Sequence, residues 1–203
     1  MSIVLPIHGQ TTWDTPLDLA LKNIAVTGVH PNDFGYQVWT SDPGFCSAGD
    51  GLVSGTVRMI KLPLNPQTYT ITSIKYFVGT AAVTPTAGQN FAGIYNSAGT
   101  RLAVTADVTA DVGTIGMKTF NLTAPIVVAA NTAVWVAILC NAGTALAGVG
   151  TAAVAAREGL FNPDQTAATA RFTSGPAGQT SLPASITMGT RTILSRAPWV
   201  AVA

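Results

Sequence analysis

Charged side chains are scarce in this sequence. Only 9% of the 203 residues are Asp, Glu, Lys or Arg, against about 25% in an average soluble domain. The ten basic and nine acidic residues give a formal net charge of +1, too small a field to attract a phosphate backbone. The composition excludes a coiled coil, and we expect no nucleic-acid partner.

Groups that carry out acid–base or metal chemistry are equally few. The chain contains two histidines, and Glu158 is its only glutamate. His30 with Asp33, and Asp42 with Asp50, lack the spacing of metal ligands. No phosphate loop, dinucleotide fingerprint or Gly-x-Ser-x-Gly motif occurs. We therefore expect a protein that is not an enzyme and that needs no metal or cofactor.

One enzymatic alternative remains open, glycoside cleavage by two carboxylates that face one cleft. The candidates are Asp107, Asp111, Glu158 and Asp164. Asp107 and Asp111 lie four residues apart in a short loop, where Asp more often caps a helix or closes a turn. Their spacing does not indicate a shared cleft, so this alternative ranks last.

Long apolar runs and a cysteine framework are also absent. The longest clean apolar stretch covers residues 133–140, whereas a bilayer span needs about 20 residues, so we expect no membrane insertion. The N-terminus lacks a basic start and is broken by Pro6, unlike a secretory signal. Cysteine is limited to Cys46 and Cys140. Two lone cysteines favour free thiols, although the sequence leaves a disulfide between them open.

Small residues dominate instead, since Ala, Thr and Gly supply 79 of the 203 positions. From residue 31 onward, short segments are divided by Gly, Pro, Asn and Asp, which is typical of strands and turns. This pattern predicts an all-β, antiparallel, jelly-roll-like β-sandwich over residues 31–203. Strands are expected at residues 57–62, 70–78, 90–95, 100–105, 118–122, 133–140 and near 198–202. Period-two alternation predicts shared buried faces for Ile74 with Tyr76 and Val78, Leu102 with Val104, and Phe120 with Leu122.

The clearest local prediction is a hairpin. Residues 91–95 and 100–104 are joined by Asn-Ser-Ala-Gly, in which Gly99 supplies the positive φ of a four-residue connection. The stretch 133–140 lacks polar alternation, so it predicts a central strand covered on both faces, with Trp135 in the core. Residues 141–185 are rich in Ala, Gly and Thr, and we expect a long loop there with one or two strands.

Residues 1–30 differ from the rest and are predicted to form an N-terminal arm. The run Thr-Pro-Leu-Asp at residues 15–18 combines a capping hydroxyl, a preset proline φ and an acidic partner. It predicts a helix over residues 15–24, which is too short to persist alone in water. The helix must therefore dock, on its own domain or on a neighbouring copy. Its apolar face would consist of Leu17, Leu21 and Ile24.

An aromatic stretch offers one opening for ligand binding. Residues 34–42 read Phe-Gly-Tyr-Gln-Val-Trp-Thr-Ser-Asp, and flat aromatic faces beside short polar side chains suit sugar rings. Tyr36 and Trp39 are therefore the candidate glycan-binding residues. The alternative interpretation is an aromatic plug that closes one end of the sandwich or lies at a subunit seam.

Two parts of the sequence carry a family resemblance. Residues 5–21, LPIHGQTTWDTPLDLAL, look like the short connector of tailed-bacteriophage fibres. Residues 85–99, PTAGQNFAGIYNSAG, followed by KTFNL at 118–122 and AVWVAIL at 133–139, are similar to the β-sandwich modules of the same proteins. The chain thus resembles virion proteins of tailed phages, especially the minor tail proteins and fibres of phages that infect actinobacteria.

The resemblance implies a non-enzymatic structural protein, homotrimeric and exposed on the virion surface. Its partners would be further copies of itself, other virion proteins and glycans of the host envelope, and it would be made in the host cytoplasm. Trp13, Leu17, Leu21 and Ile24 would serve attachment or trimerisation. Because fibres commonly hold several modules and this chain holds one, a capsid decoration or head-fibre role is the first alternative. A glycan-binding module is the second.

Overall fold

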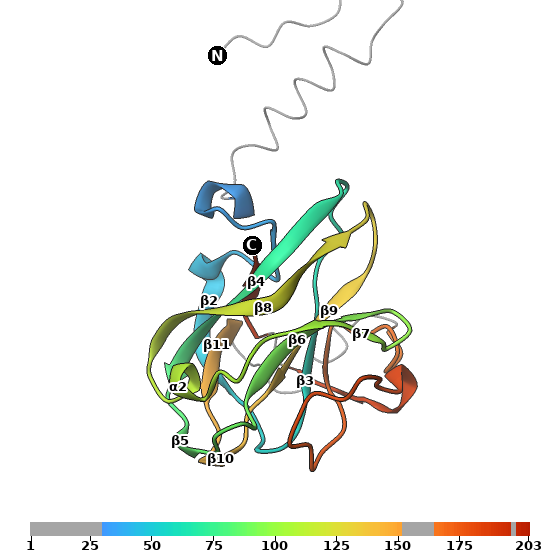
Figure 1. Cartoon of the computed structure of the whole chain (residues 1–203). Helices are drawn as coiled ribbons and strands as arrows, with labels where there is room; N and C mark the ends of the chain where they lie inside the picture. The colour runs from blue at the N-terminus through green and yellow to red at the C-terminus, as the bar shows by residue number, and fades with distance from the viewer. Residues whose placement is uncertain (1–29, 152–164, 196–197) are drawn as a thin grey trace, which may run out of the picture.

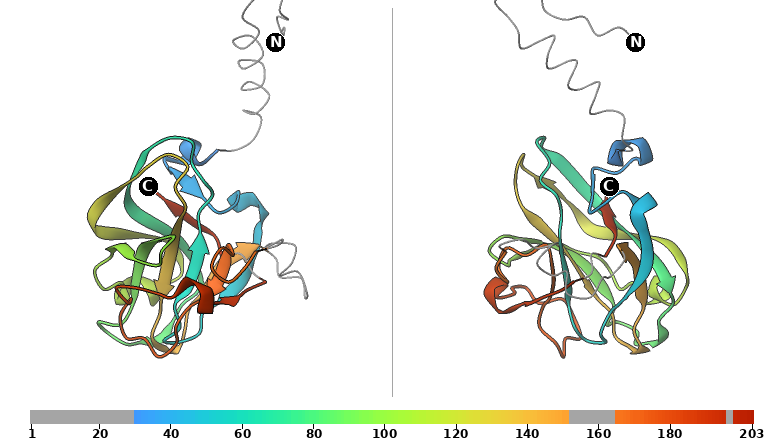
Figure 2. Two further views of the ribbon diagram at one scale, coloured as in Figure 1. Left: turned by 90° about the vertical axis from the view of Figure 1, so that its right-hand side faces the viewer. Right: turned by 180° about the vertical axis from the view of Figure 1, so that it is seen from behind.

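The computed structural model describes residues 30–151, 165–195 and 198–203. They form an antiparallel, all-β sandwich (Figures 1 and 2), which confirms the predicted fold class. The helix predicted at residues 15–24, together with Trp13, Leu17, Leu21 and Ile24, lies outside the described residues.

Sheet A is built around one long strand. Its members are β1 (Val38–Trp39), β2 (Cys46–Gly51), β4 (Tyr69–Thr80), β8 (Gly116–Val128), β11 (Ala147–Thr151) and β14 (Val200–Val202). Strand β8 pairs with β4 along one edge, while β14 and β11 pair with β4 at successive positions of the other edge. Strand β1 extends the sheet from β14, and β2 extends it from β11.

Sheet B has the order β13-β12-β3-β9-β6-β7. Its strands are β3 (Arg58–Lys61), β6 (Phe91–Asn96), β7 (Arg101–Val104), β9 (Val134–Leu139), β12 (Phe172–Ser174) and β13 (Thr192–Ile193). A bridge between Thr105 and Leu122 joins the β7 side of sheet B to β8 of sheet A. The remaining elements are β5 (Val83–Pro85), which pairs with β10 (Ala142–Thr144), the helix α2 (Thr109–Val112), and three 3-10 turns, η1 (Pro31–Phe34), η2 (Pro43–Phe45) and η3 (Met188–Thr190).

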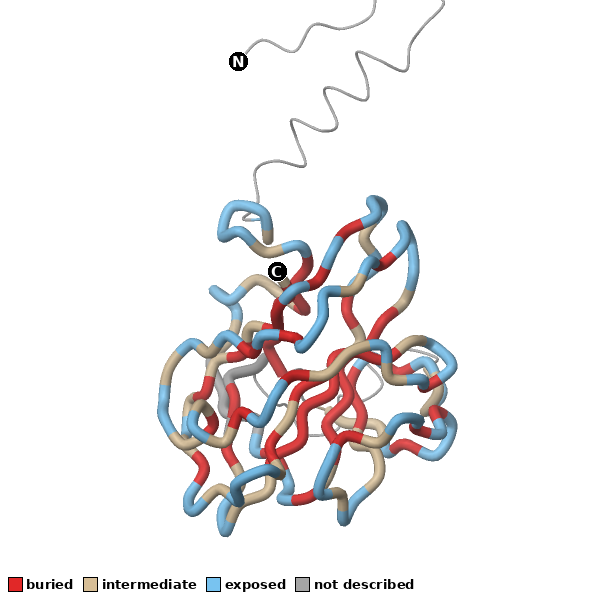
Figure 3. Tube along the Cα trace, viewed as in Figure 1, coloured by how far each residue is buried: buried red, intermediate tan, exposed pale blue. Residues whose placement is uncertain are grey.

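The main core lies between the two sheets (Figure 3). The predicted alternation is confirmed in β4 and β8, where Ile74, Tyr76, Val78, Phe120 and Leu122 are all buried in this core. In β7 the prediction for Leu102 was wrong, because it is 43% exposed. Leu102 and Val104 point to the outer side of sheet B, where β7 is the edge strand. Of these two residues, Val104 packs against the outer cluster and Leu102 does not.

The outer face of sheet B carries a second core. All six residues of β9 are buried, as the missing polar alternation predicted, and Trp135 lies in this outer cluster. The cover is a C-terminal segment, residues 176–191, which we call the strap; it is the orange-red chain beside β3 and β7 in Figure 1. The strap contributes Leu182, Ile186 and Met188 to the cluster. Apolar side chains on both faces of β9 are therefore packed against other apolar side chains.

The predicted hairpin between β6 and β7 is confirmed. Gly99 has φ +83°, and the Asn96 side chain accepts hydrogen bonds from the amides of Ala98 and Thr100. The strap crosses this turn, since the Ile186 amide donates to the Gly99 carbonyl at 2.9 Å. A Cβ at residue 99 would lie 1.9 Å from the Ile186 carbonyl oxygen, so glycine serves both the turn and the crossing.

Several elements exceed or correct the strand predictions. Strand β8 continues past Leu122 to Val128, with Pro125 at an irregularity in its pairing with β4, a position where proline is tolerated. The region 141–185 holds three described strands, β10, β11 and β12.

Both cysteines are free thiols. Within the described residues, no helix is long and apolar enough to cross a bilayer.

Candidate functional site

The two aromatic residues singled out in the sequence lie in one cluster on the outer side of sheet A. Tyr36 stacks on Phe34, with ring centroids 6.3 Å apart, and meets Trp39 edge-on at 6.5 Å. Trp199 joins from the other end of the described chain, 6.1 Å from Tyr36. Trp39 is only 8% exposed, so most of its ring packs within the protein rather than offering a flat open face.

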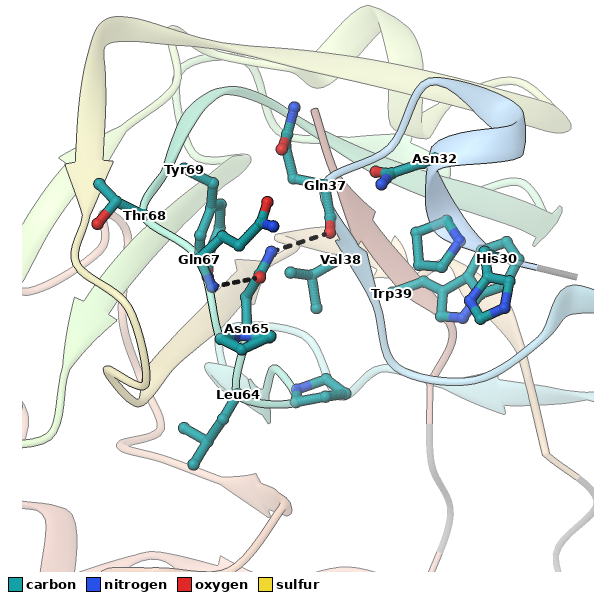
Figure 4. A pocket seen from close by; sticks show the side chains of 13 residues that line it. His30, Asn32, Gln37, Val38, Trp39, Leu64, Asn65, Gln67, Thr68 and Tyr69 are labelled. Carbon is teal, nitrogen blue, oxygen red and sulfur yellow. Dashed lines mark hydrogen bonds between the residues drawn. The ribbon is translucent and has the colours of Figure 1, made fainter. Parts of the chain in front are cut away.

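Beside this cluster lies a cavity of about 510 Å³, which we call the groove. One wall is the segment 30–39, containing η1 and β1, and the other is the connection 63–69 between β3 and β4 (Figure 4). Part of Trp39 lines the groove, whereas Tyr36 is not among its lining residues. Sequence reasoning therefore located one wall and one of its aromatic residues.

The groove is polar. Its described lining residues include His30 but no Asp, Glu, Lys or Arg. Side-chain amides and a hydroxyl supply the hydrogen-bonding groups, and these come from Asn32, Gln37, Asn65, Gln67 and Thr68. Each amide both donates and accepts, which suits a neutral, hydroxyl-rich ligand better than an ion.

Local turn chemistry fixes both walls. The Asn65 side-chain oxygen accepts from the Gln67 amide at 2.9 Å, and its Nδ2 donates across the groove to the Gln37 carbonyl at 3.4 Å. Asp33 accepts from the His30 amide at 2.8 Å at the start of η1. Gly35 then ends this turn at φ +73°, a conformation that glycine adopts without strain. Hydrogen bonds within the chain therefore fix the conformation of both walls.

Tyr69 forms part of the groove's floor and of the main core. It is 6% exposed, and its hydroxyl is buried without a hydrogen-bond partner within the described structure. Burial raises the pKa of Tyr69. The neutral phenol is therefore the form present at physiological pH, and the groove contains no ionised phenolate.

None of the described carboxylates considered for glycoside hydrolysis lines the groove. Asp107 accepts from the Thr109 hydroxyl at 2.7 Å and from the amides of Gly88 and Asn90. Burial acts to raise the pKa of Asp107, but these hydrogen bonds outweigh it and hold the pKa below its usual value. Asp111 lies in α2, and the remaining two candidates, Glu158 and Asp164, lie outside the described residues.

The residues considered as metal ligands take part in local turns. Asp33 accepts from the His30 amide at 2.8 Å, and Asp42 accepts from the Gly44 amide at 2.7 Å. Among the described residues, no group of three or more His, Cys, Asp or Glu side chains is placed to hold a metal ion.

Sequence reasoning missed the second wall of the groove. The signal was the run Pro-Leu-Asn-Pro-Gln at residues 63–67, in which two prolines and an asparagine stand between two strands. Such a run indicates a shaped turn, but nothing in it points to residues 30–39. No family model matches the chain, and no curated protein matches it with significant sequence similarity.

Proposed function

We propose that this chain is a non-enzymatic structural protein of a tailed-phage virion, a homotrimeric minor tail or fibre protein exposed on the particle surface. The observation that carries the proposal is the sequence resemblance of residues 5–21, 85–99, 118–122 and 133–139. In the fold, the last three segments supply β6, part of β8 and all of β9, and so contribute to both sheets. Partners are further copies of the chain and other virion proteins.

The outer side of sheet A supports self-association. Met117 lies opposite Phe77 there, and Val127 lies opposite Thr70. Met117 and Val127 are 49% and 71% exposed. Lys75 lies on the same face and donates to the Thr119 hydroxyl. The exposed apolar side chains around it can be covered by another copy of the chain.

Two measurements test this proposal. Light scattering on the full chain should give a mass three times that of one 20.8 kDa copy, and a monomer at all concentrations contradicts the trimer. Immunogold labelling of particles should mark the tail. Label on the head instead favours the capsid decoration or head-fibre alternative, and particles free of the protein contradict a virion role.

The groove favours a second candidate function, binding of a neutral glycan segment on the host envelope. Asn32 and Gln67 are exposed residues of opposite walls, so their substitution by Ala removes ligand contacts at little cost to folding. In a glycan array, both variants should lose most of the wild-type signal. Asn121→Ala, on the exposed side of β8, is the matched control and should keep it. No binding of the wild-type protein to any glycan contradicts this function.

A further inference from the structure

Apolar side chains form a row across the outer side of sheet A. Phe34 of η1 stacks on Tyr36, and the Tyr36 ring lies 6.1 Å from that of Trp199. Trp199 packs in one cluster with Phe77 of β4, and Phe77 lies opposite Met117 of β8. We call these five residues the apolar stripe. Its two ends are open, since Phe34 is 55% exposed and Met117 is 49% exposed.

The proposed trimer restricts how the apolar stripe can be covered. A patch that pairs with the same patch of a second copy creates a two-fold axis and therefore a dimer. A three-fold ring requires that two different surfaces meet, one from each neighbouring copy, and that the rotation between the copies closes. In a trimer, the stripe therefore needs a different apolar surface of the same chain as its partner.

The chain ahead of the described residues contains such a surface. Its sequence predicts an amphipathic helix over residues 15–24, with Leu17, Leu21 and Ile24 on one face. At 1.5 Å per residue, these three side chains extend over about 10 Å. From β14 across β4 to β8, the apolar stripe crosses two strand spacings, which also amount to about 10 Å. The two apolar surfaces therefore match in length.

The predicted helix is connected closely enough to the sandwich to make a contact between copies. Residues 25–29 join it to His30, which directly precedes η1, the turn that carries Phe34. Five extended residues span about 17 Å, whereas packed layers of secondary structure lie about 10 Å apart. A helix that leaves its own sandwich can therefore reach the stripe of a copy packed beside it.

The charges beside the two surfaces are complementary. Lys75 lies two positions before Phe77, on the same face of β4. In the predicted helix, Asp18 lies on the flank of the apolar face. An exposed pair of Lys and Asp contributes little binding energy, but it favours one orientation of the segment over the reverse.

We propose that residues 15–24 of one copy cover the apolar stripe of the next copy, and that three such contacts close the trimer. This inference rests on the proposed homotrimer and names the two surfaces that meet in it. The contact buries the apolar face of a helix that is too short to persist alone in water. It also removes the exposed parts of Phe34 and Met117 from solvent.

A chemical cross-link tests the contact on the full chain. Leu21→Cys and Met117→Cys are combined with Cys46→Ser, while Cys140, which is fully buried, is left in place. Bismaleimidoethane should then link chains, so that a denaturing gel shows species of two and three chains. In the control, Val127→Cys replaces Met117→Cys, since Val127 is 71% exposed but lies ten positions further along β8, about 33 Å away. The control should give less than a tenth of the linked species.

The linked products distinguish the possible outcomes. A link within one chain, identified by mass spectrometry of the digested single-chain band, would place the helix on its own sandwich and overturn the inference. A trimeric protein that links no more than the control would also overturn it, although the trimer itself would stand. A wild type that is monomeric at all concentrations would reject the proposed trimer and, with it, this contact.

Variants of the predicted helix measure its role in assembly. Leu17→Glu combined with Leu21→Glu should lower the mass measured by light scattering from three copies to one, because both new charges would face the stripe. Lys22→Glu is the matched control: it changes the net charge by the same two units away from the apolar face, and it should keep the trimer. A trimer that withstands the double substitution would contradict the contact.

A measurement without substitutions covers the case in which a variant does not fold. Trimers assembled from a mixture of isotope-labelled and unlabelled chains are examined by nuclear magnetic resonance. Isotope-filtered spectra should show contacts between chains that join the methyl group of Met117 to those of Leu21 or Ile24. Contacts that occur only within one chain would overturn the inference.

Discussion

The outer faces of the two sheets differ in how far other segments of the chain cover them. On sheet B, the strap closes a second apolar cluster over β9, so that strand is buried on both sides. On sheet A, β4 and β8 keep many outward side chains exposed. A small outer cluster there buries Trp39, Trp199 and Ala201 among the described residues. The outer face of sheet B thus adds a second apolar cluster to the core, whereas the outer face of sheet A stays open, with Met117 and Val127 exposed.

Removing the central side chain under the strap should have the largest effect. Trp135→Ala leaves a cavity beneath the strap and removes the contacts with Lys61 and Arg191. We expect a loss of about 3–5 kcal/mol in the free energy of unfolding. Urea denaturation measures it, with Trp39→Phe, a milder change in the small outer cluster of sheet A, as the comparison. A larger loss for Trp39→Phe would contradict the contrast between the faces.

The crossing of strap and hairpin should be the next most sensitive point. Gly99→Ala meets both the positive φ and the Ile186 carbonyl, and we expect about 2–3 kcal/mol of destabilisation. Gly88→Ala is a control for backbone strain alone, because φ is +74° there and a Cβ would meet nothing within 4 Å. Equal losses of free energy of unfolding in the two variants would show that the contact between the strap and the hairpin does not contribute to the effect at Gly99.

Tyr95 makes the stability of the strap dependent on pH. Its hydroxyl donates to the Pro183 carbonyl, and burial raises its pKa to about 12, compared with about 10 in an unfolded chain. Between these values the unfolded state has lost a proton that the folded state keeps, so this contribution to stability falls as pH rises from about 10 to about 12.

Tyr95→Phe should cost about 1 kcal/mol at neutral pH and remove this contribution to the alkaline loss of stability. Urea midpoints measured at several pH values test the effect. In addition, the phenolate absorbance of the folded wild type that develops near pH 12 should diminish in the variant. An unchanged titration curve would assign that absorbance to another tyrosine.

The smallest change in folding should come from the open face. Met117→Lys on β8 should alter the free energy of unfolding by less than about 0.5 kcal/mol. If copies associate through this face, the same variant should lower the molar mass measured by light scattering. Lys118→Met, at the next position, reverses the charge change and should leave the trimer intact. Trimers that withstand Met117→Lys would exclude this face as the interface.

The sequence predicts the parts of this fold whose residues alternate or avoid polar positions over several residues. Strands β4, β6 and β9 and the turn at Gly99 follow from such local patterns. The strands missed are short or made of small residues, such as β11, which reads Ala-Gly-Val-Gly-Thr. Pairing with distant segments, rather than side-chain periodicity, makes them strands.

The candidate site was only half predictable for the same reason. Tyr36 and Trp39 stand out as aromatic residues in a polar stretch. The opposite wall of the groove, at residues 63–69, lies near Trp39 only in the folded structure. Lys61 and Arg171 likewise line one cavity although more than one hundred positions of sequence separate them. Sequence patterns over a few residues do not indicate which distant segments lie side by side in the fold.

The pairing of β1 with β14 has a consequence for how the groove comes into existence. Val38 pairs with Val202, and Trp39 pairs with Ala201. The wall formed by residues 30–39 is therefore held in place by a strand about 160 residues further along the chain. During translation this wall stays without its support until β14 has left the ribosome. A chain clipped ahead of β14 would lose that wall. The shape of the groove therefore depends on the pairing of β1 with β14.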